Sequence, residues 1–279
     1  MKGIKKIAIV GVGFMGGSLA RAVLKKFPRV SLWGYARSKK SLTRLRKARV
    51  IKKLDLSIER VVKDADLIVL ALPVRKIMEY FKVISPFLKK GAIIIDLGSS
   101  KSKIQKAANS SLPKSVKFIG CHPLCGSEKK GVEFSKPELY NDSFCLITSS
   151  SKSKASQTIK KLWESLGAKV IFINAQTHDK ILSSISHLPH ILSFSLSKHI
   201  PDSYLKFAPA SLKDLTRISA SPASVWTDIF LTNKKNIIKD IKGFIKILKT
   251  YQASLELGSK TQLRKLILKA NAKHKKLSK

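Results

Sequence analysis

Short apolar runs alternate with amphipathic segments along most of the chain. Each run is four to seven residues long, rich in Ile, Val and Leu, and bounded by glycine, proline or charged residues, which is typical of buried strands. The runs lie at 7–10, 30–35, 66–72, 92–96, 116–120, 144–148 and 170–173. Helical periodicity lies between some of them, at 18–24, 77–88 and 156–166. The alternation predicts an α/β fold, a doubly wound parallel sheet of Rossmann type with ligands at the carboxyl ends of its strands.

The strand pattern stops after about residue 174. From 177 onward the periodicity is helical, with long amphipathic stretches at 236–257 and 262–270. Ser221 and Pro222 predict an N-cap and a first-turn proline of a further helix. We therefore predict a Rossmann domain at 1–174 and an all-helical domain for substrate binding and dimerisation at 175–279. The broad apolar face of the helical domain indicates a homodimer.

A glycine-rich turn connects the first apolar run to the first helix. Gly11, Gly13 and Gly16 have the GxGxxG spacing of dinucleotide-binding proteins. Gly11 permits a tight turn, Gly13 lets the backbone approach a pyrophosphate, and Gly16 lets helix and strand pack closely. The N–H groups at the start of the helix, where Phe14 and Met15 lie, attract the phosphate charge. The turn predicts a dinucleotide site.

The end of the second apolar run indicates which dinucleotide binds. NAD enzymes usually place an acid about 20 residues after the glycines, to bind the ribose 2′-hydroxyl. Here the run ends in Ala36, Arg37, Ser38 and Lys39, and the next acid is Asp55. Arg37 can stack on adenine and contact a 2′-phosphate, with Ser38 and Lys39 as further donors. The segment favours NADP, with NAD possible; alternatively, it is only part of a very basic surface.

The chain is strongly basic. Its 279 residues include 55 Lys and Arg against 17 Asp and Glu, a net charge of +38. Such an excess commonly indicates a nucleic-acid or membrane-surface partner. Here the lysines are spread over almost every predicted solvent face, and no nucleic-acid motif with interleaved aromatic residues occurs. We expect no specific nucleic-acid partner and interpret the charge as a compositional bias that attracts anionic substrates.

Apolar run lengths and cysteine content favour the cytoplasm. No apolar segment approaches the ~18 residues of a membrane span, and the N-terminus lacks the apolar region of a secretory signal. We expect no membrane partner. Cys121, Cys125 and Cys145 are an odd number, which favours reduced thiols. Cys121 and Cys125 flank His122, but these three potential ligands lack a usual zinc spacing, so we expect no metal and interpret the two cysteines as small packing residues.

Candidate catalytic residues lie in a loop after a strand and in the helical domain. His122 follows an apolar run, and a histidine beside a nicotinamide is a natural proton acceptor for an alcohol being oxidised. Arg217 offers a bidentate grip on a carboxylate. His187 and His190 lie three apart and share one helix face. The alternative for each residue is an ordinary packed, hydrogen-bonded side chain.

Several sequence motifs occur in a characteristic order. They are Gly11-Val12-Gly13-Phe14-Met15-Gly16-Gly17-Ser18-Leu19, Asp96-x-Gly98-Ser99-x-Lys101, His122-Pro123-x-x-Gly126-Ser127-Glu128-Lys129-x-Gly131, His178-Asp179, Ser186-His187-Leu188-Pro189-His190, Asp214-Leu215-Thr216-Arg217-Ile218 and Trp226-x-Asp228-Ile229. Together they resemble the prephenate/arogenate dehydrogenases of tyrosine biosynthesis. The resemblance implies a Rossmann domain followed by a helical dimerisation domain. It also implies oxidative decarboxylation of prephenate to 4-hydroxyphenylpyruvate with hydride transfer to NAD(P).

The resemblance also implies a role for each candidate residue. His122 accepts the proton of the ring 4-hydroxyl while C4 gives up a hydride, and Ser99 orients that hydroxyl and the His122 ring. Arg217 binds the ring carboxylate that leaves as carbon dioxide. Glu128 lies at the pocket mouth near Arg217. The implied substrate-binding set is Arg217, His190, His187, Ser127 and Glu128.

Two departures from the family pattern and three alternatives bear on the function. Ala36 stands where NAD-type members carry an acid, and Cys121 and Cys125 stand where small residues are common. Arogenate dehydrogenase is one alternative; we favour prephenate because His190 can donate to its keto group or side-chain carboxylate, although Glu128 favours the arogenate ammonium. Another Rossmann reductase of the 3-hydroxyacid type, or a non-enzymatic basic binding protein, would leave the candidate residues unused.

Overall fold

The computed structural model of the protein describes residues 3–126, 131–149 and 151–277. By the contacts between Cα atoms, the chain divides into two units, Met1–Asn233 and Lys234–Lys279. The predicted boundary at 174 falls inside the first unit, where it separates the strands from the helices that follow, and it stays a prediction.

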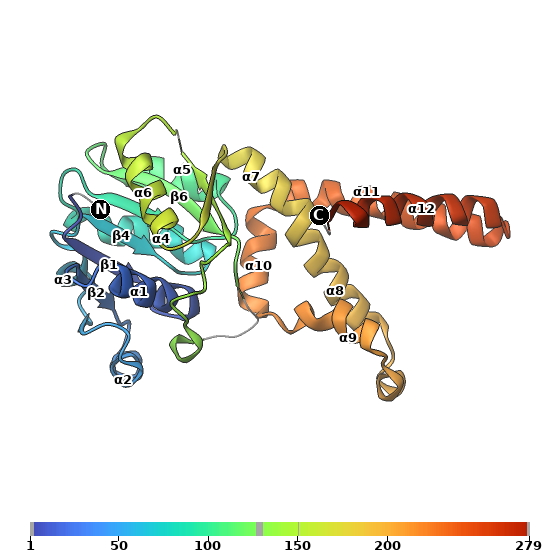
Figure 1. Ribbon diagram of the computed structural model, residues 1–279, viewed down its shortest axis with the longest axis horizontal. Coiled ribbons are helices and arrows are strands. Elements are labelled where there is room, and N and C mark those ends of the chain that lie inside the picture. The colour runs from blue at the N-terminus through green and yellow to red at the C-terminus, as the bar shows by residue number, and fades with distance from the viewer. Residues whose placement is uncertain (1–2, 127–130, 150, 278–279) are drawn as a thin grey trace. The chain divides into compact units, whose positions relative to one another are not determined.

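Within the described residues, the first unit contains one sheet of eight strands in the order β3-β2-β1-β4-β5-β6-β7-β8. Figure 1 labels β1, β2, β4 and β6 of this sheet. All neighbouring strands run parallel except β6 and β7, which are antiparallel. The strands are β1 (Lys6–Val10), β2 (Ser31–Tyr35), β3 (Lys53–Asp55), β4 (Leu67–Leu70), β5 (Ile93–Asp96), β6 (Lys117–Pro123), β7 (Phe144–Thr148) and β8 (Lys169–Phe172). The predicted fold class is therefore confirmed. The pattern missed β3, since its three residues, KLD, include only one apolar side chain.

Helices cover both faces of this sheet. They are α1 (Phe14–Lys26), α2 (Lys39–Ala48), α3 (Ile58–Val62), α4 (Val74–Ile84), α5 (Ser102–Ser111) and α6 (Lys154–Ser165), with 3₁₀ turns η1 (Ser85–Phe87) and η2 (Val132–Phe134). Helix α4 was predicted at 77–88 but ends at Ile84. The chain continues as the 3₁₀ turn η1, which contains Pro86, because proline has no backbone N–H to extend the α-helix.

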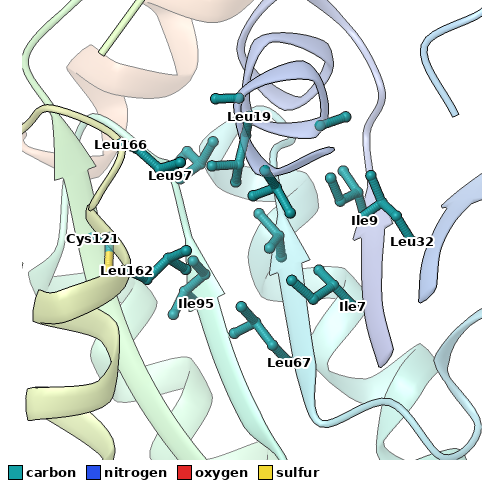
Figure 2. Close-up of a cluster of buried hydrophobic side chains, with 14 of the residues drawn as sticks. Ile7, Ile9, Leu19, Leu32, Leu67, Ile95, Leu97, Cys121, Leu162 and Leu166 are labelled. Carbon is teal, nitrogen blue, oxygen red and sulfur yellow. The ribbon is translucent and has the colours of Figure 1, made fainter. Parts of the chain in front are cut away.

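Successive residues of each central strand point to opposite faces and so enter different cores. Ile7 and Ile9 of β1 belong to one buried cluster, whereas Ala8 and Val10 belong to another. The first cluster includes Leu19 of α1 and Leu162 of α6, and Figure 2 shows Leu162 beside Ile95 and Cys121. Ile77 and Phe81 of α4 and Ile104 of α5 pack in the second. Burying one such Ile, Leu or Phe stabilises the fold by roughly 1.5–3 kcal/mol.

Helical elements complete the first unit after β8. They are α7 (Ala175–Leu182), the π-helical turn η3 (Ser183–His187), α8 (Leu188–His199), η4 (Asp202–Phe207), α9 (Ala210–Thr216), η5 (Arg217–Ala220) and α10 (Ala223–Thr232). The N-cap of α10 is Pro222, one residue later than the predicted cap at Ser221. The reason is that the Pro222 carbonyl already accepts from the N–H groups of Val225 and Trp226, both at 3.1 Å.

The second unit contains helices α11 (Lys234–Glu256) and α12 (Lys260–Leu277), which contact each other (Figure 1). Gly258, at φ +60°, ends α11 in the left-handed conformation that favours glycine. The N–H of Ser259 donates to Ser254 O at 3.0 Å and that of Gly258 to Leu255 O at 3.0 Å, the hydrogen-bond pattern of a Schellman motif. No helix in the described part of the chain is both long enough and apolar enough to cross a membrane.

Candidate active site

The glycine turn between β1 and α1 has the geometry of a phosphate-binding turn. Gly11 has φ +99°, and a Cβ there would overlap the carbonyl of Ala71. A Cβ on Gly16 would overlap the carbonyl of Gly11, so helix and turn pack too closely for a side chain. At Gly13, by contrast, a Cβ would meet no described atom within 4 Å. The backbone is therefore open to a ligand at the glycine predicted to approach a pyrophosphate.

Helix α1 begins at this turn without a side-chain cap from any described residue. Gly13 is the N-cap, and Phe14 and Met15 are the first two helical residues. Tyr140 Oη donates to Met15 O at 2.7 Å, and Ser18 Oγ donates to Phe14 O at 2.7 Å, so these contacts use carbonyls and leave the terminal N–H groups for an anion. The residues present thus fit a dinucleotide, and Gly11, Gly13, Phe14, Met15 and Gly16 would hold its pyrophosphate.

Basic side chains follow β2, the neighbour of β1. Ala36 is buried, whereas Arg37, Ser38 and Lys39 are exposed. Ser38 also has a structural role that the sequence analysis missed, because its hydroxyl caps α2 by accepting from Ser41 N at 3.2 Å. The segment presents cationic groups at the strand end, and its contact with a 2′-phosphate stays a prediction.

The nearest acid on the adjacent strand is already paired. Asp55 lies opposite Tyr35 in the register of β2 and β3. Arg60 holds its carboxylate through Nε to Oδ2 and Nη2 to Oδ1, each at 2.8 Å, and this bidentate pair is the main reason that the pKa of Asp55 is lowered. The negative charge of Asp55 is therefore balanced by Arg60, at the edge of the sheet where an NAD enzyme would use a free carboxylate to bind the ribose.

His122 lies near the carboxyl end of β6, which pairs in parallel with β5 and so ends at the same edge of the sheet as β1. Its Nδ1 is 2.9 Å from Nε2 of His178, a fully buried residue of α7. Nδ1 of His178 is in turn 2.9 Å from Oδ1 of Asp179. Three side chains from two distant segments thus form one hydrogen-bonded series.

Asp179 connects this series to the loop that carries Ser99. Its Oδ1 accepts from Lys101 N at 2.7 Å and its Oδ2 from Ser102 N at 2.9 Å, so the carboxylate caps the N-terminus of α5. Burial alone would raise the pKa of Asp179, but hydrogen bonds from His178, Ser102 and Lys101 outweigh burial and lower that pKa. Asp179 is therefore an acceptor at every bond described.

A buried ion pair fixes the same loop from the other side. The Lys101 ammonium donates to the Asp96 carboxylate, and both side chains are at most 1% exposed. Asp96 also accepts from Gly98 N at 2.8 Å and from Cys121 N at 3.3 Å. Burial raises the pKa of Asp96, and the Lys101 ammonium opposes that rise. Half-buried Ser99 lies between these anchored residues, in the loop that follows β5.

The surroundings keep His122 neutral. Burial is the main cause that its pKa lies well below the usual histidine value, and the neighbouring His178, Lys101 and His187 lower it further. Neutral imidazole has one nitrogen that donates and one that accepts. At neutral pH His122 can therefore accept a proton.

His187 and His190 contact the same aromatic ring, Trp226 of α10. His190 stacks on Trp226 with ring centroids 3.4 Å apart, and its Nδ1 lies 2.9 Å from Ser186 O. His187 contacts Trp226 edge-on at 6.1 Å. Buried His187 also joins the Asp179 network, since Asn233 Nδ2 lies 3.1 Å from His187 Nδ1 and donates to Asp179 O at 2.7 Å.

The structure says less about the other predicted residues. Arg217 is exposed at the start of η5, and its predicted grip on a carboxylate stays a prediction. Ser127 and Glu128 lie outside the described residues. Cys121 and Cys145 are free, buried thiols in the first core cluster. Across 3–126, 131–149 and 151–277, no three His, Cys, Asp or Glu side chains are grouped to hold a metal ion.

The sequence analysis missed the positions of His178, Asp179 and Asn233 beside the candidate base. His178 and Asp179 were noticed only as a motif, without a role. An adjacent histidine and aspartate just after the last strand was the available signal, but their partners lie more than 50 residues away, at His122 and Lys101. No local pattern reports such a contact.

A glycine turn that is open at Gly13 and a neutral histidine at the same edge of a Rossmann sheet are typical of a nicotinamide-dependent oxidoreductase. Family models agree: "Prephenate dehydrogenase, nucleotide-binding domain" matches residues 19–172, and "Prephenate dehydrogenase, dimerization domain" matches residues 174–269. The chain belongs to the prephenate dehydrogenase family, which confirms the resemblance drawn from its motifs and its assignment as a dehydrogenase.

Individual relatives support the same placement. The chain is 34% identical to a prephenate dehydrogenase of Lactococcus lactis over 87% of this chain and 69% of that protein. It is 31% identical to a cyclohexadienyl dehydrogenase of Zymomonas mobilis over 90% of this chain and 88% of that protein. The crystal structure of prephenate dehydrogenase from A. aeolicus with hydroxyphenyl propionate and NAD⁺ superposes with a TM-score of 0.90 and 31% identity, covering 98% of each chain.

Proposed function

We propose that this protein oxidatively decarboxylates prephenate to 4-hydroxyphenylpyruvate in tyrosine biosynthesis. The observation that carries the proposal is the neutral His122, held by His178 and Asp179 at the same sheet edge as the glycine turn, in a member of this family. A bound nicotinamide dinucleotide supplies the hydride acceptor. The chain itself then needs only to position C4 of the substrate and to handle one proton.

His122 handles that proton through Nε2, because Nδ1 is engaged by His178. As C4 gives up its hydride, the hydroxyl proton moves to His122 Nε2. The bond from the ring to the leaving carboxylate then breaks, and its electrons make the ring aromatic. The oxygen at C4 becomes a phenolate that takes the proton back, so no net proton is released.

The neighbouring residues orient the substrate in this proposal. Ser99, on the loop anchored by Lys101 and Asp179, orients the ring hydroxyl and the His122 ring. Arg217 binds the carboxylate that leaves. His190, His187, Ser127 and Glu128 complete the pocket for the side chain, as the family resemblance implies.

We further propose that NADP is preferred to NAD. Exposed Arg37, Ser38 and Lys39 follow β2, and the acid at the neighbouring strand end, Asp55, is held by Arg60. A 2′-phosphate would therefore meet cations rather than a free carboxylate. The complex of the A. aeolicus relative contains NAD⁺, so the coenzyme preference has to be measured on this protein.

Prephenate is the proposed substrate, and arogenate is the second candidate. The imidazole of His190 can donate to the keto group or carboxylate of prephenate. Arogenate carries an ammonium instead, and the name of the Z. mobilis relative, a cyclohexadienyl dehydrogenase, admits either acid. The test measures kcat/KM for each acid with NADP, using the absorbance of reduced nicotinamide to monitor the reaction. Turnover of neither acid would refute the proposed function, and a several-fold higher value for arogenate would reverse the assignment.

We also propose that the protein is a cytoplasmic homodimer. Residues 174–269 match a dimerization domain, and the sequence predicts a broad apolar helical face there. Sedimentation velocity at micromolar concentration tests the dimer.

A further inference from the structure

The protonation state of His122 can be worked out from the hydrogen bonds behind it. Asp179 is ionised at neutral pH, because the N–H groups of Lys101 and Ser102 that donate to Oδ1 and Oδ2 favour the carboxylate and its pKa lies below the ordinary aspartate value. A carboxylate has no proton to donate. The short contact between Asp179 Oδ1 and His178 Nδ1 therefore requires that His178 Nδ1 carries a hydrogen.

The same reasoning extends one residue further. His178 is buried and its pKa is lowered, with burial as the main cause, so the ring is neutral and has only one N–H. That hydrogen is on Nδ1, so Nε2 of His178 is an acceptor. His122 Nδ1, 2.9 Å away, must then be the donor. Because His122 is also neutral, its own Nε2 is left with the lone pair.

We propose that His178 and Asp179 are positioning residues that hold His122 in the tautomer with an unprotonated Nε2, ready to accept the substrate proton. The proposal rests on the proposed function only in naming that proton; the tautomer itself follows from the contacts. It differs from a general packing role because it specifies which His122 nitrogen carries hydrogen.

Asp179 gives the arrangement a second consequence. The carboxylate that orients His178 also caps α5 and anchors the loop after Ser99. The direction of the His122 lone pair and the place of the Ser99 loop therefore depend on one group. When His122 becomes protonated during turnover, its Nδ1–H still points at His178, and the ionised Asp179 lies behind that ring to stabilise the charge.

The charged and titratable groups around His122 come from several elements. His178 and Asp179 come from α7, Lys101 precedes α5, and His187 ends η3; Asp96 pairs with Lys101. Among the described residues that act on His122, the fixed positive charge is thus Lys101, whose ammonium is paired with Asp96. Asp179, the ionised acceptor at the end of the series, therefore sets the direction in which both hydrogen bonds donate.

Two substitutions of His178 separate positioning from packing. In His178→Gln, one amide can accept from His122 Nδ1–H with its oxygen and donate to Asp179 with its nitrogen. In His178→Leu neither bond is possible. We expect His178→Leu to lower kcat by about 10- to 100-fold, the usual cost of losing an orienting partner, with KM for NADP changed less than about threefold. His178→Gln should recover most of that loss.

The matched control is His199→Gln, since His199 is exposed at the end of α8. It should leave kcat unchanged. Equal kcat for His178→Leu and wild type would overturn the proposal, and so would a His178→Gln variant that folds, binds NADP normally and is as slow as His178→Leu.

A direct test of the tautomer needs no substrate. Long-range ¹H–¹⁵N spectra of histidine-labelled protein with NADP report which nitrogen of each imidazole carries hydrogen, and only six histidines are present. The signal absent from His122→Asn identifies His122. We expect hydrogen on Nδ1 in the wild type and in His178→Gln, and a mixture of tautomers in His178→Leu.

Asp179→Asn extends the test to the end of the series. Its amide can turn an NH₂ toward His178, which then no longer has to present Nε2 as an acceptor, so His122 should again show mixed tautomers. Hydrogen on Nε2 of wild-type His122 would overturn the inference even in an active enzyme. Conversely, the expected tautomer in a protein that turns over neither acid would refute the proposed function alone.

Discussion

The two halves of the ligand edge of the sheet are built in different ways. After β1 and β2, the groups expected to hold the coenzyme come from one continuous segment, 11–39, and mostly act through backbone or exposed side chains. After β5 and β6, His122 depends on buried side chains from separate segments, His178, Asp179 and Lys101. The first half should therefore tolerate substitution at open positions. In the second half, substitution of one buried residue should disturb the others that are hydrogen-bonded to it.

The largest expected effect concerns the base itself. His122→Asn retains a polar side chain but loses the nitrogen that takes the proton, so kcat should fall by roughly 10²–10⁴-fold. KM for the substrate should change much less. Steady-state kinetics with saturating NADP measure both constants, and a variant with nearly full kcat would mean that another residue is the base.

Acid should weaken the fold through the buried histidines. Burial lowers the pKa of His187 from its ordinary 6.5 to about 4 in the folded state. As the pH falls, the unfolded chain takes up this proton before the folded chain does. The free energy of unfolding is therefore unaffected by His187 above pH 6.5 and declines as the pH falls from 6.5 toward 4. The full effect for one group is on the order of 3 kcal/mol.

Urea unfolding at several pH values measures this loss. His187→Gln, which cannot titrate, should show a shallower decline in the free energy of unfolding below pH 6.5 than the wild type. Identical slopes would contradict the assignment of this effect to His187. Replacement of the exposed His199 by Gln is the control and should leave the slope unchanged.

Two glycines of the same turn should behave oppositely. In Gly16→Ala the new Cβ overlaps Gly11 O, and such overpacking typically costs 1–3 kcal/mol, so we expect about 2 kcal/mol of destabilisation. In Gly13→Ala the Cβ points into open space, so the free energy of unfolding without coenzyme should change by no more than about 0.5 kcal/mol.

For coenzyme binding, by contrast, Gly13→Ala should be the more damaging of the two substitutions. A methyl group at Gly13 occupies the space proposed for the pyrophosphate, so the Kd for NADP should rise by about tenfold or more, a loss of at least ~1.4 kcal/mol. Calorimetric titration of both folded variants measures it. Unchanged NADP affinity in Gly13→Ala would place the dinucleotide elsewhere.

The smallest effect tests the cationic segment after β2. Wild-type kcat/KM should favour NADP over NAD by at least about tenfold, equivalent to one charge-assisted contact of ~1.4 kcal/mol. Arg37→Ala should remove most of that preference and leave the kinetics with NAD nearly unchanged. Lys47→Ala, at an exposed position later in α2, is the control. An equal or reversed preference in the wild type would refute the NADP proposal.

The sequence by itself determined the class of fold and the packing of the glycine turn. Apolar runs such as 7–10 and 92–96 became β1 and β5, and Gly11, Gly13 and Gly16 took the places that their spacing predicts. Periodicity and local turn chemistry report such features because neighbouring residues create them. For the same reason the motifs were sufficient to identify the family.

Only the tertiary structure decided how His122 is held. Its hydrogen-bond partner His178 lies 56 residues further along the chain, and its low pKa results mainly from burial that no linear pattern expresses. The commitment of Asp55 to Arg60 likewise appeared only in the fold, although it determines whether an acid is free at the strand end. A side chain's pKa and its free lone pairs are set by whatever packs against it, and in this sheet those neighbours come from distant segments.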